Sequence, residues 1–304
     1  MLQQIDTLTD KHSGVVAATI AYLLWGTLPV YWKLLLEVPA YEILCHRMVW
    51  SLLVTGGLVL VLGKQRSLWA SLKDLKTVAI FTLVALLLGV NWLVYIWSVN
   101  AGYIIEASLG YFINPLINVL LGVIFFKERM RPMQWFALLL VCCGVVYLTL
   151  YYGQFPWIAL TLALTFSVYG LLHKKISVPP LEGLCLETIV LFVPALFFLV
   201  LVEVKGNGAF YHGGQSTSLL LAGTGAVTAI PLLFFGYAAK KMSLSTLGLL
   251  QYMAPTISLL IGIFMYGESF PQERIIGFSI IWAALLLYIS DNMVNRARQK
   301  KKLQ

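Results

Sequence analysis

The chain has 304 residues, of which 60% are hydrophobic and 11% are charged, whereas an ordinary soluble domain has about 25% charged residues. This composition excludes a soluble fold, because no soluble core could absorb so much apolar surface, whereas a bilayer accepts it in helices of roughly 20 apolar residues. The formal charge is +8, but its distribution along a membrane protein carries more information than its sum, and we expect no nucleic-acid partner.

Apolar runs separated by polar breaks predict ten membrane-spanning helices. In chain order they are expected at residues 14–34, 43–62, 76–98, 103–125, 132–151, 154–172, 184–204, 218–239, 246–266 and 271–290. Residues 1–12 are polar and no small-residue cleavage site follows, so we expect the first helix to be retained. The expected fold is an all-α integral membrane protein.

The basic residues indicate how these helices are oriented. If the N-terminus is cytoplasmic, 17 of the 21 lysines and arginines lie in cytoplasmic segments, three lie outside and Arg47 lies within a span. Loops that carry an excess of lysine and arginine face the cytoplasm. We therefore expect both termini to be cytoplasmic.

An internal repeat relates the two halves of the chain at one constant offset of 140 residues. The matching pairs are Pro39 and Pro179, Glu42 and Glu182, Leu44 and Leu184, Cys45 and Cys185, Leu109 and Leu249, Pro115 and Pro255, Leu120 and Leu260, Gly122 and Gly262, and Glu128 and Glu268. Because each half has an odd number of spans, the halves must have inverted topology. The sequence predicts a first five-helix repeat at 1–151, a second at 152–291 and a basic cytoplasmic tail at 292–304.

The second span carries Glu42, His46 and Arg47, with Glu42 and His46 on one helical face. Glu106 begins the fourth span at the same expected side of the membrane, so Arg47 and Glu106 could pair. A charged group at the centre of a span costs about 2.5–3.5 kcal/mol on insertion scales. One interpretation is that this cluster binds a charged or zwitterionic substrate or relays a proton through His46 and Glu106. The other is a structural ion pair between helices.

Polar and aromatic residues near the middle of three spans are candidates for a binding pocket. Asn91 on the third span needs hydrogen-bond partners, and Trp92 and Tyr95 offer aromatic faces beside it; bonding between helices is the alternative explanation. Two interrupted spans carry near-symmetric sets, which are Tyr111, Asn114 and Pro115 on the fourth and Gln251, Tyr252 and Pro255 on the ninth. Prolines at corresponding positions of two halves point to a transporter's binding site, although a plain kink explains them equally well.

Glu187 on the seventh span occupies the repeat position of Arg47, so an acid on one side corresponds to a base on the other. It is a candidate coupling carboxylate, or a structural partner of Lys174 or Lys240. The sequence contains no nucleophile, phosphate-binding or metal-ligating signature. We therefore expect neither an enzyme nor a bound metal or cofactor.

Six runs of the sequence have a recognisable pattern, and they are Tyr22–Gly26, Glu42–Arg47, Asn91–Leu93, Glu106–Pro115, Leu244–Gly248 and Gln251–Tyr252. Together they resemble the drug/metabolite transporter superfamily and, within it, its EamA-type members. The resemblance covers nearly the whole chain. It implies a bacterial inner-membrane permease with a central cavity between its halves, which moves drugs or metabolites outward.

The expected function is therefore secondary transport of a small drug-like or metabolite molecule by alternating access, among membrane lipids and with protons as a candidate coupling ion. The expected substrate-binding residues are Asn91, Trp92, Tyr95, Tyr111, Asn114, Gln251 and Tyr252. The expected coupling or gating charges are His46, Arg47, Glu106 and Glu187. Two alternatives stay open, namely a passive channel or facilitator, which needs a continuous polar path, and a non-transporting membrane scaffold.

Overall fold

The computed structural model of the protein describes residues 2–127, 131–151, 153–174, 178–241 and 250–303. Helices and short connections make up these residues, and no strand occurs among them. In chain order the helices are α1 (Leu2–Lys33), α2 (Ala40–Val61), α3 (Gln65–Lys73), α4 (Leu75–Asn100), α5 (Ile104–Phe126), α6 (Pro132–Tyr151), α7 (Trp157–Lys174), α8 (Pro180–Val204), α9 (Ala209–His212), α10 (Gln215–Lys241), α12 (Met253–Leu260), the π-helix η1 (Ile261–Met265) and α13 (Gln272–Leu303). The prediction of an all-helical protein is confirmed.

The expected spans can be compared with these helices one by one. Within the described ranges, eight helices are long and apolar enough to cross a membrane. The expected spans at 154–172 and 246–266 correspond to shorter apolar helices, Trp157–Leu172 and Met253–Met265. Helices α3 and α9 lie in connections and were not expected, because neither carries an apolar run long enough to register as a span.

The first and last helices extend beyond their expected ends. Helix α1 begins at Leu2 instead of residue 14, and α13 continues to Leu303 instead of ending near residue 290. Neither extension contains glycine or proline, and lysine, arginine and glutamine are good helix formers in water. Most of the expected basic tail at 292–304 therefore continues the last helix.

Local chemistry explains where the long helices begin and end. Asp74 caps the N-terminus of α4 by accepting hydrogen bonds from the Lys76 and Thr77 amides. The Thr77 hydroxyl also donates to Asp74 Oδ2 at 2.6 Å and holds the pKa of that carboxyl below its usual range. Gly63 and Gly102 follow the C-terminal ends of α2 and α4 with φ of 66° and 81°, the left-handed conformation that glycine adopts at helix ends.

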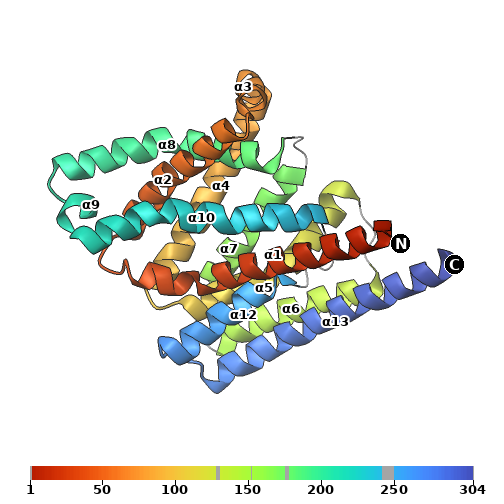
Figure 1. The fold of residues 1–304 in the computed structure, drawn as a ribbon. Coiled ribbons are helices and arrows are strands. Elements are labelled where there is room, and N and C mark those ends of the chain that lie inside the picture. The colour runs from red at the N-terminus through yellow and green to blue at the C-terminus, as the bar shows by residue number, and fades with distance from the viewer. Residues whose placement is uncertain (1, 128–130, 152, 175–177, 242–249, 304) are drawn as a thin grey trace.

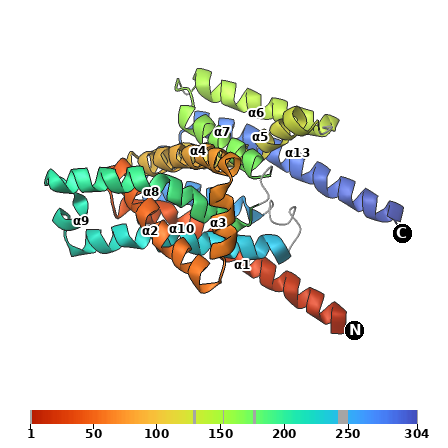
Figure 2. The same cartoon turned by 90° about the horizontal axis from the view of Figure 1, so that it is seen from above.

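The helices form one bundle in which the ends of the chain come together. In both views the N- and C-termini lie at the same end of the bundle, whereas α9 lies at the opposite end (Figures 1 and 2). Helix α6 runs beside α13 at the edge of the bundle (Figure 1). The main contacts nearer its middle are α1 with α10 and α12, α2 with α8 and α10, α4 with α7 and α8, and α5 with α7 and α12.

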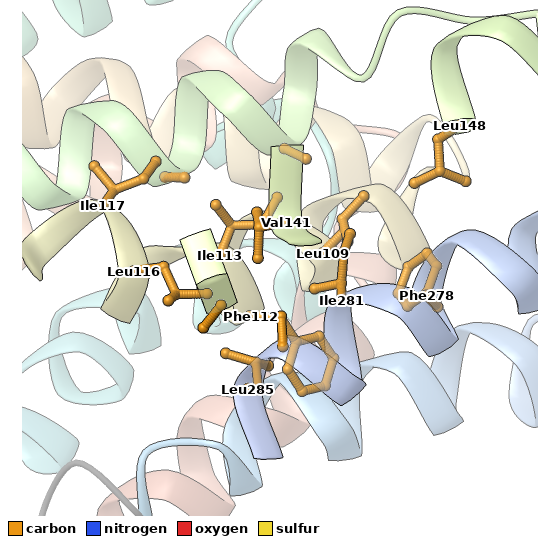
Figure 3. Close-up of a cluster of buried hydrophobic side chains, with 14 of the residues drawn as sticks. Leu109, Phe112, Ile113, Leu116, Ile117, Val141, Leu148, Phe278, Ile281 and Leu285 are labelled. Carbon is orange, nitrogen blue, oxygen red and sulfur yellow. The ribbon is translucent and has the colours of Figure 1, made fainter. Parts of the chain in front are cut away.

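Apolar side chains of α5, α6 and α13 form one of the buried clusters, shown in Figure 3. Leu109, Phe112 and Ile113 of α5 pack there with Val141 of α6 and Ile281 of α13. Lipid tails are as apolar as these side chains, so close packing rather than removal from water holds such helices together.

Glycine permits the closest approach between two pairs of helices. A Cβ atom on Gly110 of α5 would lie 2.7 Å from the Ala159 carbonyl oxygen of α7. A Cβ atom on Gly225 of α10 would lie 2.5 Å from the Trp50 backbone of α2. Small residues have this role at helix interfaces in membranes, and here they set the spacing of the helices that carry the polar residues described next.

Candidate functional site

Asn91 of α4 joins three helices at the centre of the bundle. Its side chain is 1% exposed. The Nδ2 atom donates to the Leu162 carbonyl oxygen at 3.0 Å and to Thr165 Oγ1 at 2.9 Å, both on α7. The Oδ1 atom accepts from the Tyr111 hydroxyl of α5 at 3.3 Å. Because both amide hydrogens are used within the protein, Asn91 positions Tyr111 and ties α4 to α7.

Asn114 of α5 lies on the same α7 interface and is fully buried. Its Oδ1 atom accepts from the Ser167 hydroxyl at 3.0 Å, whereas its Nδ2 atom is buried with no hydrogen-bond partner. A buried amide donor that lacks a partner costs about 1–3 kcal/mol. Asn114 is therefore held by α7 on one side and keeps an unused donor on the other.

A row of aromatic rings connects α4, α5 and α7. The centroids of Tyr95 and Tyr111 are 5.7 Å apart, those of Tyr111 and Phe166 are 6.2 Å apart, and those of Phe166 and Tyr169 are 5.6 Å apart. These spacings fall in the range of favourable aromatic contacts. The row gives the centre of the bundle a rigid, mostly apolar wall with polar tips.

Arg47 of α2 lies against this region and is 4% exposed. Its Nε atom donates to Thr228 Oγ1 of α10 at 2.8 Å. The guanidinium carbon lies 3.7 Å from the centroid of the Trp92 ring and 5.4 Å from that of Trp32. The Nη1 atom is buried without a hydrogen-bond partner. Arg47 therefore joins α1, α2, α4 and α10 through one hydrogen bond and two cation–π contacts.

The expected pairing of Arg47 with Glu106 is wrong. Glu106, in the first turn of α5, forms a largely buried ion pair with Arg274 of α13, and Arg274 Nη1 also donates to the Ser269 carbonyl oxygen at 2.8 Å. The two arginines lie on different sides of the bundle, because Arg47 faces α10 whereas the first turn of α5 faces α13.

A cavity of about 410 Å³ beside this ion pair is lined by Trp97, Tyr103 and Trp157, among others.

His46 and Glu42 lie at the end of the bundle formed by α9. The His46 ring stacks on Phe210 of α9 with centroids 5.2 Å apart, and its Nε2 atom is buried without a partner. Glu42 Oε1 accepts from the Ala209 amide at 2.6 Å and so caps α9. His46 is therefore next to Arg47 in sequence but faces the connection between α8 and α10.

Glu187 of α8 is 2% exposed. It accepts a hydrogen bond from the phenol of Tyr169 on α7. The side chains of Lys174 and Lys240, its other expected partners, lie outside the described residues. Glu187 consequently connects α8 to the aromatic row through Tyr169.

Gln251 and Tyr252 lie apart from Asn91. The Tyr252 ring stacks on Phe112 of α5 with centroids 6.4 Å apart, and its hydroxyl is buried without a partner. Phe112 follows Tyr111, and consecutive helical residues point about 100° apart, so Tyr252 packs on another face of α5. Gln251 is partly buried in the turn before α12. The expected pocket thus divides into two groups on either side of α5.

The structure adds Trp32, Thr228 and Arg274 to the residues singled out from the sequence. Trp32 and Thr228 contact Arg47, and Arg274 pairs with Glu106. The sequence signal for Arg274 is a charge at the start of the last expected span, 271–290. No comparable signal marks a tryptophan or threonine inside an apolar helix. Over the part of the chain that the structure describes, no cluster of side chains could hold a metal ion.

Comparison with known proteins supplies the family context for this geometry. The EamA-like transporter family matches residues 12–150 and 156–290. Protein RarD of Streptomyces exfoliatus is 44% identical over 295 residues, which cover 97% of this chain and 94% of that protein. The uncharacterized transporter YojE of Bacillus subtilis is 43% identical over 283 residues, covering 92% and 94%. A solved crystal structure has a TM-score of 0.59 at 22% identity and covers 90% of this chain and 96% of its own, so it shares the fold.

Proposed function

This chain belongs to the EamA-like transporter family and is a multi-pass membrane transporter, and we propose that it moves a small drug-like or metabolite molecule across the bacterial cytoplasmic membrane by alternating access. The observation that carries this proposal is the buried polar and aromatic layer of Arg47, Trp92, Tyr95, Tyr111 and Asn114, which lies where helices from both halves of the chain meet. Polar groups inside a membrane are costly, and in transporters they mark substrate and ion pathways.

The pattern of helix contacts supports an inverted repeat. Under the offset of 140 residues, α1, α2, α4, α5 and α6 exchange with α7, α8, α10, α12 and α13. The contact of α1 with α10 then exchanges with that of α7 with α4, and the contact of α5 with α7 exchanges with that of α12 with α1. The pairs α2–α8, α5–α12 and α6–α13 exchange with themselves. Repeats that can exchange in this way provide two equivalent arrangements around one site.

The substrate contacts in this proposal are Trp92, Tyr95, Tyr111 and the free amide donor of Asn114, with Asn91 positioning Tyr111. Gln251 and Tyr252 form a second wall on the other face of α5. The three groups that can take up a proton in this assignment are His46, Glu106 and Glu187, so the proposed coupling is to protons.

In this proposal, contacts around the N-terminus of α5 close the bundle at the end where α9 lies. Glu106 pairs with Arg274, and Glu268 Oε1 and Oε2 accept from the Ile104 and Ile105 amides at 2.7 and 2.9 Å. These contacts connect α5 to α13 and to the segment before it. Their rupture is the opening step of the proposed cycle, because charge-assisted hydrogen bonds are among the stronger contacts that hold these elements together.

Transport is tested in two stages. Untargeted comparison of metabolites inside and outside cells with and without the protein identifies the cargo without a prior guess. Uptake of that cargo into proteoliposomes, with and without an imposed pH gradient, then measures transport and coupling. We expect saturable uptake that Asn114→Leu reduces at least tenfold and that Ser71→Ala, a change at a partly exposed position of α3, leaves unchanged. Uptake that ignores the gradient would remove proton coupling and keep the carrier, whereas uptake that never saturates would favour a passive channel.

A further inference from the structure

The Arg47 side chain keeps hydrogen-bonding capacity that the protein does not use. A guanidinium has five N–H donors, and the described contacts of Arg47 engage only Nε, with Thr228 Oγ1. The Thr228 hydroxyl itself donates to the Thr224 carbonyl oxygen at 2.8 Å, so it acts as the acceptor for Arg47. Arg47 Nη1 is fully buried without a partner, and so is the indole Nε1 of Trp32, whose ring lies 5.4 Å from the guanidinium.

No acidic side chain compensates the Arg47 charge in the part of the chain that the structure describes. The titratable side chains that act electrostatically on its guanidinium are the phenols of Tyr95 and Tyr111. Glu106 forms an ion pair with Arg274, and Asp291 forms an ion pair with Arg131 at 2.6 Å. The remaining neighbours are aromatic faces and a hydroxyl. The immediate surroundings of Arg47 therefore leave its positive charge uncompensated and have an excess of donors.

From this arrangement we propose that Arg47 binds the carboxylate of the transported substrate, and that the substrate is an organic monocarboxylate with an apolar or aromatic body. This inference rests on the proposed transport function and names the chemical class of its cargo. A planar guanidinium matches a carboxylate with two parallel hydrogen bonds. The faces of Trp92 and Trp32 beside it suit the apolar body of such a molecule.

Charge balance sharpens the class. A single carboxylate neutralises the charge of Arg47. The loaded site is then neutral, so holding the substrate in the low-dielectric interior has a lower electrostatic cost. A dianion would leave one uncompensated negative charge. An α-amino acid would bring an ammonium group for which the surroundings of Arg47 supply no carboxylate. We therefore expect the protein to bind a monocarboxylate more tightly than the corresponding amino acid, and also more tightly than the corresponding neutral amide.

Binding tests this order on the full-length protein in lipid nanodiscs, with thermal stabilisation as the readout. The probes are phenylacetate and 3-phenylpropanoate, their amides phenylacetamide and 3-phenylpropanamide, and L-phenylalanine. We expect at least one carboxylate to stabilise the protein at a concentration at least tenfold below that of its amide, with L-phenylalanine weaker than 3-phenylpropanoate. Equal stabilisation by acid and amide, or none by either acid, would overturn the proposal.

Variants of Arg47 assign the effect to this side chain. R47M should abolish the preference for the acid over the amide without lowering the melting temperature of the empty protein, because it removes an uncompensated buried charge. R47K keeps the charge but loses the planar fork and should bind the acid several-fold more weakly. R131Q, which removes an arginine paired elsewhere with Asp291, should retain full preference. If R47M does not fold, an unchanged acid-to-amide ratio in R47K contradicts the proposal.

The proposed transport function and this inference can fail separately. Saturable transport of a neutral or cationic cargo that R47K leaves unchanged would refute the role of Arg47 and keep the transporter. Arg47-dependent binding of a monocarboxylate in a protein that transports none of the cargo candidates would refute the transport mechanism and keep the site.

Discussion

Buried polar side chains of this protein fall into two kinds that differ in how completely they are satisfied. Asn91 uses its amide hydrogens on α7 and its oxygen on Tyr111. Arg47 and Asn114 each keep a buried donor without a partner. Inside a membrane no bulk water can supply the missing bond. Residues of the first kind hold helices together, and residues of the second kind are those on which a ligand can act.

Glu268 is the residue whose contribution to stability is easiest to isolate. Its carboxylate accepts from two amides at the N-terminus of α5, where a negative charge also interacts favourably with the helix dipole. We expect Glu268→Ala to lower the free energy of unfolding by about 1 kcal/mol, a typical loss for removal of an N-terminal cap. Thermal denaturation in nanodiscs measures the change. Glu273→Ala, which removes an exposed carboxylate in the first turn of α13, is the control, and equal effects of both variants would refute the capping of α5 by Glu268.

The ion pair of Glu106 and Arg274 is expected to behave as a unit. Either E106Q or R274Q leaves one buried charge alone, which costs about 3–5 kcal/mol, whereas the double variant leaves none. The double variant should therefore be more stable than the sum of the single effects predicts, by at least about 1 kcal/mol. The more exposed pair Arg131 and Asp291 provides a parallel cycle with an expected coupling of about 0.2–1 kcal/mol. Additive effects at Glu106 and Arg274 would contradict the pairing.

At the scale of single elements, glycine sets the distance between α5 and α7. A methyl group at Gly110 would collide with the Ala159 carbonyl oxygen, so Gly110→Ala should separate the two helices and cost about 1–3 kcal/mol, as overpacking does. Gly170 of α7 has open space around its Cβ position, and Gly170→Ala should be neutral or slightly stabilising, because alanine favours a helix. Unfolding by denaturant in mild detergent compares them. A harmless Gly110→Ala would mean that the interface is looser than described.

The positions of the helices followed from sequence, but their contacts did not. Apolar runs located each long helix, because the bilayer requires such runs. In a membrane the lipid-facing and core-facing sides of a helix are both apolar, so hydropathy does not reveal how a helix is rotated. Depth alone therefore predicts a pair of Arg47 with Glu106, and hydropathy gives no sign of the contacts that Trp32 and Thr228 make with Arg47. The ends of α1 and α13 were missed for another reason, since a polar helix that continues into water carries no apolar signal.

The placement of α3 and α9 predicts how the whole molecule is oriented in the membrane. The basic connection that contains α3 should face the cytoplasm and α9 should face outward. In a variant that lacks Cys45, Cys142, Cys143 and Cys185, we expect a membrane-impermeant maleimide to label Tyr211→Cys in α9 on intact cells. Ser71→Cys in α3 should react only after lysis. The opposite labelling pattern would invert the assigned orientation and with it the side on which Glu106 and Arg274 close the bundle.

The three hydrogen bonds of Asn91 have a mechanical consequence for the whole molecule. Two of them fasten α4 to α7 and the third joins α4 to α5, whereas the repeat position of Asn91 on α10 is Pro231, which has neither an amide side chain nor a backbone N–H. The corresponding contact of α10 with α1 has the aromatic rings of Tyr22, Trp25 and Phe235, and its hydrogen bonds, between the Ser13 and Tyr237 hydroxyls and from the Tyr31 hydroxyl to the Leu220 carbonyl oxygen, lie nearer the helix ends. Two halves of similar shape are therefore fastened at different depths, the α4–α7 pair at a buried amide and the α1–α10 pair near the ends of its helices.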